Sequence, residues 1–510
     1  MFKNHPRGLL AASLANMGER FGFYTMMAIL TLFLMAKFGL DETKAGIIYS
    51  IFYFSIYILA FVGGLIADKK QNFKGTILVG LLLMSLGYLI IAIPTPTPVP
   101  TGSFGMFLTL TCFGLFVIAF GNGLFKGNLQ ALVGQMYDNP QYSKMRDSGF
   151  SLFYMFINVG AIFAPLAAVG VRNWWVGSHG FLYDSDLPAL CHEQLGGSIS
   201  SEAALRMQEL AAKVGYTGTD MSAFANDYLN VFTTGFHYAF AVAIIAMFIS
   251  LVIYMVNKKN FPNPRVIDKN TSGVVVDEMD IAEIKKRLYA LFAVFGVVIF
   301  FWFSFHQNGL TLTYFAKDYT LLSNLKINLG FNVIQGAEIF QSANPLFVVL
   351  LTPILMSIFG ALRARGKEPS TPKKIAIGMG IAALAYVVMS LGSMGLPSKD
   401  EIIAMGGLPD AQRVTPMLLI GTYLILTIAE LFISPLGISF VSKVAPPKYQ
   451  GIMQGCWLGA TAIGNQLLFI GAIFYKNISI SGTWCVFVVA CVISMCTMLA
   501  MLKWLERIAK

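Results

Sequence analysis

Charged side chains are scarce in this sequence. Of its 510 residues only 12% are charged, whereas 56% are hydrophobic. Soluble globular proteins carry about 25% charged residues, so a chain of this composition cannot cover its surface with polar groups. The scarcity excludes a soluble enzyme, a disordered scaffold and a secreted disulfide-rich module. The sequence therefore predicts an all-α integral membrane protein that has the lipid bilayer as its surroundings.

Cysteine and histidine are also few, and their positions exclude further classes. Of the six cysteines, five lie in apolar stretches and Cys191 stands alone in a polar loop, so no structural disulfide is expected. None of the five histidines is paired at metal-ligand spacing on one helix. The sequence also contains no GxSxG, P-loop or HExxH motif. We therefore expect no enzyme activity, no metal site and no cofactor.

Long hydrophobic runs, in contrast, are abundant. About 20 apolar residues span a bilayer as a helix, and the sequence contains twelve such runs. The predicted transmembrane helices are 8–38, 45–67, 75–95, 104–136, 147–172, 231–256, 288–317, 341–362, 373–396, 414–442, 451–475 and 481–504.

Two polar segments divide these helices. The basic segment 257–287 separates six helices from six, which predicts a cytoplasmic linker between a bundle at 1–256 and a bundle at 288–510, as in transporters with alternating access. We expect 173–230 to be an extracytoplasmic cap or spacer, with a short amphipathic helix near Glu202–Val214. Lys and Arg concentrate in segments on the side of both termini, which the positive-inside rule places in the cytoplasm of a cell-membrane protein. Since this placement explains the net charge of +10, no nucleic-acid partner is expected.

Ionisable residues inside the predicted helices indicate a functional site. A charge in the hydrocarbon layer costs about 2.5–3.5 kcal/mol or more, so it needs a partner or a water-filled cavity. The candidates are Glu19, Arg20, Lys126, His306 and Glu430. Because neighbours on a helix do not face each other, we expect Glu19 and Arg20 to act separately rather than as a fixed ion pair. For His306, a structural role with a hydrogen bond to a hydroxyl or a carbonyl is as consistent with the sequence as a functional role.

The two predicted bundles carry opposite charges at these positions. Arg20 and Lys126 belong to the first bundle, and Glu430 belongs to the second. A cavity between the bundles would suit a zwitterion, with its carboxylate against the two cations and its ammonium against Glu430. Candidate aromatic residues of the cavity wall are Tyr24, Tyr57, Trp302 and Trp457.

Several short motifs follow one another in an order that is typical of a known family. The run 18–24 resembles the family's ExxERFxYY motif, 63–68 its loop motif after the second helix, and 153–160 its FYxxINxG signature. The remaining similar positions are Gly121 to Asn128, Asn344-Pro345, Glu430 with Ser434-Pro435, and Trp457 with Gly464-Asn465. On these motifs nearly the whole chain resembles the proton-dependent oligopeptide transporter (POT/PTR) family of the major facilitator superfamily.

The resemblance implies the major facilitator fold of two six-helix bundles. It also implies a symporter that imports di- and tripeptides by alternating access and uses the proton gradient as its energy source. Arg20 and Lys126 would hold the peptide carboxylate, and Glu430, helped by Asn158 and Asn344, would hold the amino terminus. The residues that would shape the side-chain pockets are Tyr24, Tyr57, Trp302 and Trp457. The expected partners are peptide, protons and lipid, and the chain is expected to be a monomer.

Three positions depart from the family pattern. Asn16 replaces the first Glu of ExxER, Met27 replaces an Arg seven residues after Arg20, and His306 replaces an acid. In the family the last two positions can form a salt bridge between the bundles, so the loss of both ends indicates a replaced gate. Proton coupling could then rest on His306, on Glu19 or on Glu430, and the sequence does not choose between them.

A second interpretation is a family relative with a changed substrate, such as an amino-acid conjugate or another organic anion, or with weakened proton coupling. The three departures favour it. Glu430 argues against it, since an acid that binds ammonium is of little use to a carrier of simple anions. A channel is disfavoured because the sequence has no reentrant filter loop.

Overall fold

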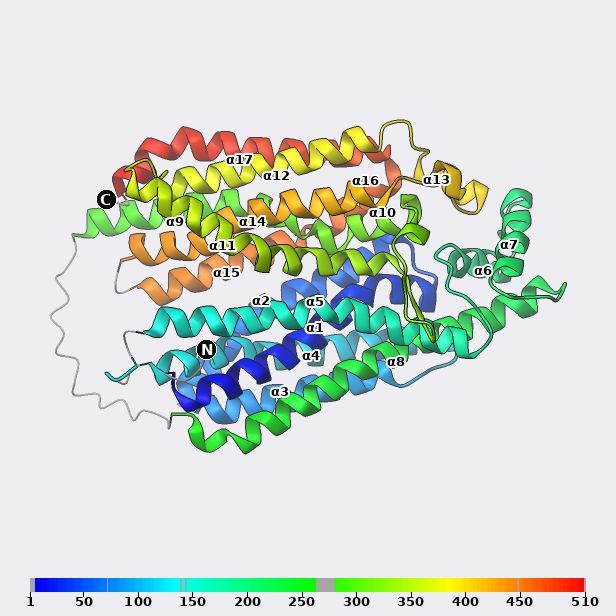
Figure 1. The fold of residues 1–510 in the computed structure, drawn as a ribbon, viewed down its shortest axis with the longest axis horizontal. Helices are drawn as coiled ribbons and strands as arrows, with labels where there is room; N and C mark the ends of the chain where they lie inside the picture. The colour runs from blue at the N-terminus through cyan, green and yellow to red at the C-terminus, as the bar shows by residue number, and fades with distance from the viewer. Residues whose placement is uncertain are drawn as a thin grey trace.

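The computed structural model describes residues 5–70, 72–137, 140–142, 145–262, 280–446 and 449–508. Almost all regular structure in these ranges is helical, and twelve helical segments are long and apolar enough to cross a membrane. They run side by side along the long axis of the molecule (Figure 1). Each of the twelve predicted spans coincides with one of these segments, so the predicted all-helical class and number of spans are confirmed.

The first six spans form one group of helices, called here the first half. Their helices are α1 (Arg7–Phe38), α2 (Glu42–Lys70), α3 (Phe73–Ala92), α4 (Phe104–Met136), α5 (Arg146–Ser178) and α8 (Met221–Val256). Within the group α3 and α2 pack on α4, and α1 packs on α5 and α8. These contacts leave α2 and α5 free to face the other half.

The last six spans form the second half. Their elements are α9 (Ile281–Phe305), η4 (His306–Gly309), α10 (Thr311–Tyr319), η6 (Ala337–Ser342), α11 (Ala343–Ala364), α12 (Thr371–Gly392), α14 (Pro416–Val444), α15 (Gln450–Gln466), α16 (Leu468–Asn477) and α17 (Ile480–Ile508). In this group α12 packs on α14 and α17, and α9 packs on α15 and α17. The halves meet where α2 lies against α15 and α16, and where α5 lies against α11 and η6.

Two spans of the second half are broken at the same level. Span seven breaks at the 3₁₀ turn η4, and span eleven breaks between α15 and α16. The breaks face each other, because His306 Nδ1 donates to Oδ1 of Asn465 and Gln307 Nε2 donates to the carbonyl of Leu468 at 3.3 Å. The Gln307 bond satisfies a backbone carbonyl beside the break of span eleven, and the His306 bond joins the two breaks through their side chains. Hydrophobicity alone predicts continuous helices here, since both breaks lie within apolar runs.

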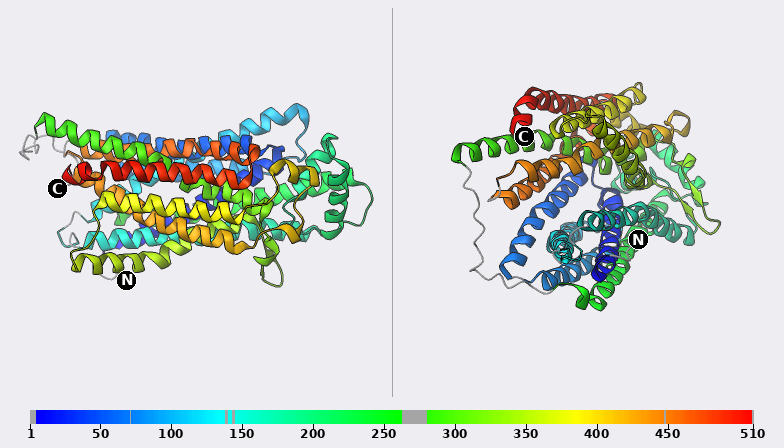
Figure 2. Two further views of the ribbon diagram at one scale, coloured as in Figure 1. Left: turned by 90° about the horizontal axis from the view of Figure 1, so that it is seen from above. Right: turned by 60° about the vertical axis from the view of Figure 1, so that its left-hand side comes forward.

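The connecting segments gather at the two ends of the molecule. Both termini lie toward one end, called here the terminal end, and α6 and α7 lie at the opposite end, called the insert end (Figures 1 and 2). The shorter elements are η1 (Thr101–Ser103), α6 (Leu187–Gly196), α7 (Ser201–Lys213), η3 (Lys258–Asn260), η5 (Leu322–Asn324), β1 (Ile327–Asn328), β2 (Val333–Ile334), α13 (Lys399–Met405) and η7 (Asp410–Gln412). β1 and β2 pair as an antiparallel hairpin.

The long polar segments are more helical than the sequence predicts. Because α5 continues to Ser178 and α8 begins at Met221, the part of 173–230 between the spans is only 179–220, called here the insert. Its helix α7 coincides with the predicted amphipathic helix and buries Met207 and Leu210, whereas α6 was not predicted. At the segment 257–287, α9 begins before the predicted boundary, and residues 263–279 lie outside the described residues.

Glycine allows α2 and α4 to approach closely. A Cβ atom at Gly63 would lie 2.2 Å from the carbonyl oxygen of Gly123, and one at Gly123 would lie 2.4 Å from the carbonyl oxygen of Leu59. No real side chain tolerates such distances, so the two backbones touch as small residues permit in membrane helices. The contact fixes Lys126 of α4 relative to Tyr57 of α2.

We expect Gly123→Ala to lower the free energy of unfolding by about 1–3 kcal/mol, because its methyl group would overpack the contact. Gly127→Ala is the matched control, since a Cβ atom there meets nothing within 4 Å and alanine favours the helix. Thermal unfolding of the purified protein in detergent measures both variants. Equal midpoints would contradict the role given to this contact.

Candidate functional site

A cavity of about 350 Å³ lies between the two halves and is called here the central cavity. Its volume falls within the range of about 300–1,000 Å³ that is typical of sites for small molecules. The predicted residues that line it are Arg20, Tyr24, Tyr57, Lys126, Asn158, Trp302, His306, Asn344, Glu430 and Trp457. The structure therefore brings the predicted substrate-binding residues and His306 to one place, whereas Glu19 is not among the lining residues.

Arg20 and Glu19 of α1 form a bidentate ion pair. Nε and Nη2 of Arg20 donate to the two oxygens of Glu19 at 2.6 and 2.7 Å. Glu19 is fully buried behind Arg20 and also accepts a hydrogen bond of 2.6 Å from Asn122 Nδ2. The expectation that these helix neighbours act separately was wrong. The Arg20 side chain is long enough to turn toward Glu19, and its planar guanidinium matches both oxygens of the carboxylate.

Lys126 presents its charge to the central cavity. Its Nζ lies 4.6 Å from the centre of the Tyr57 ring, which is a cation–π contact. In the part of the chain that the structure describes, no carboxylate lies within ion-pair distance of Lys126. The first half therefore offers one cation that is held by an acid, Arg20, and one that is not.

Glu430 of α14 supplies the opposite charge from the second half. One of its oxygens accepts a hydrogen bond of 2.8 Å from Nδ2 of Asn344, and the same amide lies 3.0 Å from Oγ1 of Thr427. Among the described residues, no Lys or Arg forms an ion pair with Glu430. The Asn344 amide thus orients a carboxylate that is free to accept further donors from the cavity.

His306 lies at the break of span seven and is enclosed by rings. Its imidazole stacks on Trp302 at 4.9 Å between centroids and lies 4.9 Å from Tyr53. Its Nδ1 donates to the side-chain oxygen of Asn465, so Nε2 is left as an acceptor. The contacts of His306 among the described residues are thus aromatic rings and a neutral amide.

Several lining residues were missed by sequence reasoning. Tyr53, Gln130 and Tyr154 each lie four residues from a predicted residue on the same helix, so helical periodicity carried a signal for them. Asn308 and Gln341 lie in the 3₁₀ turns η4 and η6 and gave no periodic signal. Met27, one of the departures from the family pattern, also lines the cavity.

A buried ion pair joins the halves at the insert end. Nη1 of Arg172 in α5 donates to Glu338 in η6, and both side chains are fully buried. Nε and Nη2 of Arg172 donate to Oδ1 of Asn173 at 3.0 Å and to the carbonyl of Gln335 at 3.2 Å. The guanidinium also lies 4.4 Å from the centre of the Tyr183 ring. We call this pair and its partners the α5–η6 latch.

A second group of charges, Lys399 with Glu42 and Asp318, also joins the halves and is called here the Lys399 group. Nζ of Lys399 lies 2.9 Å from Glu42 at the start of α2 and 2.7 Å from Asp318 of α10. Burial disfavours the charged amine, but the carboxylates of Asp318 and Glu42 outweigh it and raise the pKa of Lys399 above its ordinary value. Lys476 and Asp41 form a further pair at 2.7 Å.

The position of these pairs defines the state of the molecule. Within the described ranges, every ion pair between the two halves lies at the insert end. The residues of the α5–η6 latch and the Lys399 group are absent from the lining of the central cavity. The structure is therefore closed at the insert end by charges that are separate from the candidate binding site.

Known proteins are similar to this chain in sequence and in fold. Residues 74–277 and 264–484 match the model of the POT family. The peptide transporter YePEPT of Yersinia enterocolitica is 30% identical over 482 residues, which cover 91% of this chain and 87% of that protein. A di-/tripeptide transporter of Lactococcus lactis is 28% identical over 487 residues, which cover 91% of this chain and 89% of that protein.

Solved structures show the same fold. A peptide transporter POT in complex with sulfate matches with a TM-score of 0.72 at 23% identity, and the match covers 100% of this chain and 96% of that chain. A POT family transporter in complex with 5-aminolevulinic acid matches with a TM-score of 0.71 at 22% identity, covering 100% and 98%. The predicted major facilitator fold is thereby confirmed.

We expect Glu338→Gln to destabilise the protein by about 3–5 kcal/mol, because it leaves the buried Arg172 charge without its anion. The double variant Arg172→Leu/Glu338→Leu is expected to recover most of this loss, since it removes both charges. Glu283→Gln is the matched control, because it disrupts only solvent-accessible ion pairs with Arg287 and Lys286, which water screens and which stabilise a protein little. Thermal unfolding in detergent measures all three variants. If Glu338→Gln lowers the stability no more than the control does, the latch does not stabilise the protein.

Proposed function

The chain belongs to the POT family, and from this premise we propose that it imports di- and tripeptides together with protons by alternating access. Relatives named as peptide transporters align over most of its length. The twelve apolar spans make it a multi-pass membrane protein. The function uses no metal or organic cofactor, and the proton gradient supplies the energy.

One observation carries the proposal, namely the charge polarity of the central cavity. Lys126 and Arg20 line it from the first half, and Glu430 lines it from the second. A peptide with free termini carries the complementary pair of charges, and its carboxylate and ammonium can each form charge-assisted hydrogen bonds. Asn158 and Asn344 supply neutral amides beside these charges, and aromatic rings supply the surface for the peptide side chains.

The two cations differ in their availability. Lys126 has no acid partner among the described residues, so it is the first anchor of the peptide carboxylate. The fork of Arg20 is occupied by Glu19, so a peptide carboxylate competes with Glu19 for the same guanidinium. A proton on Glu19 weakens its hold on Arg20 and favours the peptide. We therefore assign proton coupling to Glu19 and give His306 a neutral hydrogen-bonding role.

The orientation follows from the basic loops. Because Lys and Arg concentrate on the side of both termini, we place the terminal end in the cytoplasm and the insert end outside the cell membrane. The structure then represents a state closed toward the outside. Opening to the outside requires the α5–η6 latch and the Lys399 group to separate. The insert 179–220 serves as a cap over this closure, and the chain acts as a monomer.

The alternative substrate, an organic anion without an amino group, suits this cavity less well. Such a ligand would satisfy Lys126 and Arg20 but would leave the carboxylate of Glu430 facing an unpaired site. A buried charge without a partner is costly, so the cavity favours ligands that bring an ammonium group.

We expect Glu430→Gln to raise the KM for dialanine about 10- to 100-fold, because it removes the charge-assisted hydrogen bond to the peptide amino group. The measurement is uptake of labelled dialanine into proteoliposomes with an inward proton gradient. Glu209→Gln, at an exposed position of the insert, is the matched control. Uptake by Glu430→Gln that equals the control would contradict the assignment of the peptide amino terminus to Glu430, and absence of dialanine uptake by the unsubstituted protein would support the organic-anion carrier.

Glu19→Gln is expected to abolish gradient-driven accumulation of dialanine while leaving equilibration across the membrane, because the competing charge is permanently removed. Its uptake should lose the pH dependence of the unsubstituted protein. His306→Asn is the comparison variant and should retain that pH dependence. The reverse result, with a flat profile for His306→Asn and an ordinary one for Glu19→Gln, would assign the coupling proton to His306.

A further inference from the structure

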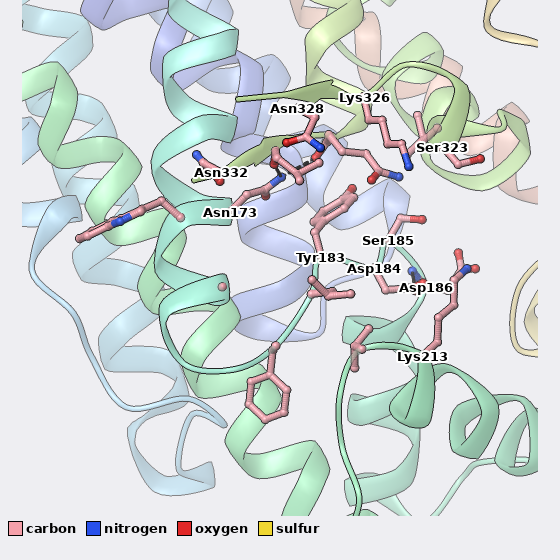
Figure 3. A pocket seen from close by; sticks show the side chains of 18 of the residues that line it. Asn173, Tyr183, Asp184, Ser185, Asp186, Lys213, Ser323, Lys326, Asn328 and Asn332 are labelled. Atoms are coloured by element: carbon pink, nitrogen blue, oxygen red, sulfur yellow. Dashed lines mark hydrogen bonds between the residues drawn. The ribbon is translucent and has the colours of Figure 1, made fainter. Parts of the chain in front are cut away.

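A second and larger cavity lies at the insert end. It has a volume of about 640 Å³ and shares no lining residue with the central cavity. One side contains Asp184 and Ser185, which follow α5. The other side contains Ser323 and Lys326, which precede β1, and Asn328 of β1 (Figure 3). Both halves of the molecule therefore contribute to this space, called here the insert cavity.

The insert cavity lies directly on the α5–η6 latch. Asn173 and Gln335 line the cavity. The same residues accept hydrogen bonds from the guanidinium of Arg172 at 3.0 and 3.2 Å. Asn173 Nδ2 in turn donates to the carbonyl of Gln335 at 2.9 Å. A ligand in the insert cavity would thus contact the layer that closes the insert end.

Most charges around the insert cavity are already paired. Arg413 lies 2.6 Å from Asp186 and also donates to the carbonyls of Leu408 and Lys317. Lys213 lies 3.6 Å from Asp410. These groups neutralise one another, so they do not by themselves call for a ligand.

Two charges of opposite sign are not paired in this way. The carboxylate of Asp184 accepts backbone N–H groups from Asp186 at 2.9 Å and from Leu187 at 3.3 Å. It forms no ion pair within the described ranges, although Arg413 attracts it at longer range. Lys326 is exposed and, among the described residues, has no ion pair. One charge comes from each side of the cavity, which is the arrangement that a zwitterion satisfies.

Exposed apolar side chains complete the lining. Phe331 is 81% exposed and Leu182 is 60% exposed, and both lie outside the apolar spans. Large apolar groups that remain open to solvent around a polar cavity are typical of a binding surface. Aromatic rings offer a large apolar area on which a peptide side chain can pack.

We propose that the insert cavity is a second peptide-binding site, where a short peptide binds with its carboxylate on Lys326 and its ammonium on Asp184. The inference rests on the proposed function, since it takes the same class of ligand as the central cavity. The site is weaker than the central one, because its charges are open to water. A peptide bound there bridges the two halves and holds the insert end closed. High external peptide concentrations would therefore slow uptake.

The test uses the full-length Glu430→Gln protein in nanodiscs, in which the central site is weakened. Equilibrium dialysis with labelled Ala-Phe is expected to find two equivalents bound to the unsubstituted protein and one residual equivalent bound to Glu430→Gln. Adding Lys326→Glu or Asp184→Asn to Glu430→Gln should weaken the residual binding about 10-fold. Adding Lys285→Glu, at an exposed position near the terminal end, is the matched control and should leave the residual binding unchanged.

The outcomes separate this inference from the proposed function. One equivalent on the unsubstituted protein and none on Glu430→Gln would overturn the second site and leave the proposed function intact. Residual binding that resists both Lys326→Glu and Asp184→Asn would also overturn it. Equal displacement of Ala-Phe by inorganic phosphate and by N-acetyl-Ala-Phe would mean an anion site rather than a peptide site. Binding of Ala-Phe that is unaffected by Glu430→Gln at both sites would instead contradict the proposed function.

Discussion

A charge inside a lipid-embedded helix bundle needs a partner or a polar cavity, and this requirement organises the molecule. One solution is an internal ion pair, as for Arg20 with Glu19 and for Arg172 with Glu338. The other is exposure to the central cavity, as for Lys126 and Glu430, whose described contacts include no opposite charge. Paired charges hold helices and halves together, whereas cavity charges remain available to a ligand. One set of ionisable residues therefore stabilises the structure, and the other set remains available for ligand binding.

The paired charges also define the direction in which the cavity is closed. The α5–η6 latch and the Lys399 group both join the halves at the insert end. Separating a buried pair without replacing its partners costs several kcal/mol, so these contacts favour the closed state strongly. A ligand that bridges the halves shifts this equilibrium only by its difference in affinity for the two states. Any ligand that opens the insert end must therefore act on contacts that differ between the open and closed arrangements.

The sequence predicts much of the fold and of the cavity, but not the pairing of charges. Twelve spans follow from hydrophobic length, and Lys126 and Glu430 stand out because a charge in an apolar run is rare. The breaks at His306 and beside Asn465 were missed, since apolar composition does not distinguish a continuous helix from a broken one. Arg172 is the last residue of the predicted span 147–172, and Glu338 lies just before the predicted span 341–362, so neither stood out as a charge within an apolar run. Only the tertiary structure brings these two together, because sequence spacing carries no information on partners 166 residues apart.

The separation of paired charges from cavity charges also explains two departures from the family pattern. Met27 and His306 both line the central cavity, and neither carries a charge that could pair across it. A salt bridge at those positions would place further charges in the central cavity, beside Arg20, Lys126 and Glu430. In this chain the charges that close the insert end lie outside the cavity lining, in the latch and the Lys399 group. Closure and the lining of the central cavity then rest on different residues, so the closing contacts can change without altering the opposed charges of Lys126 and Glu430.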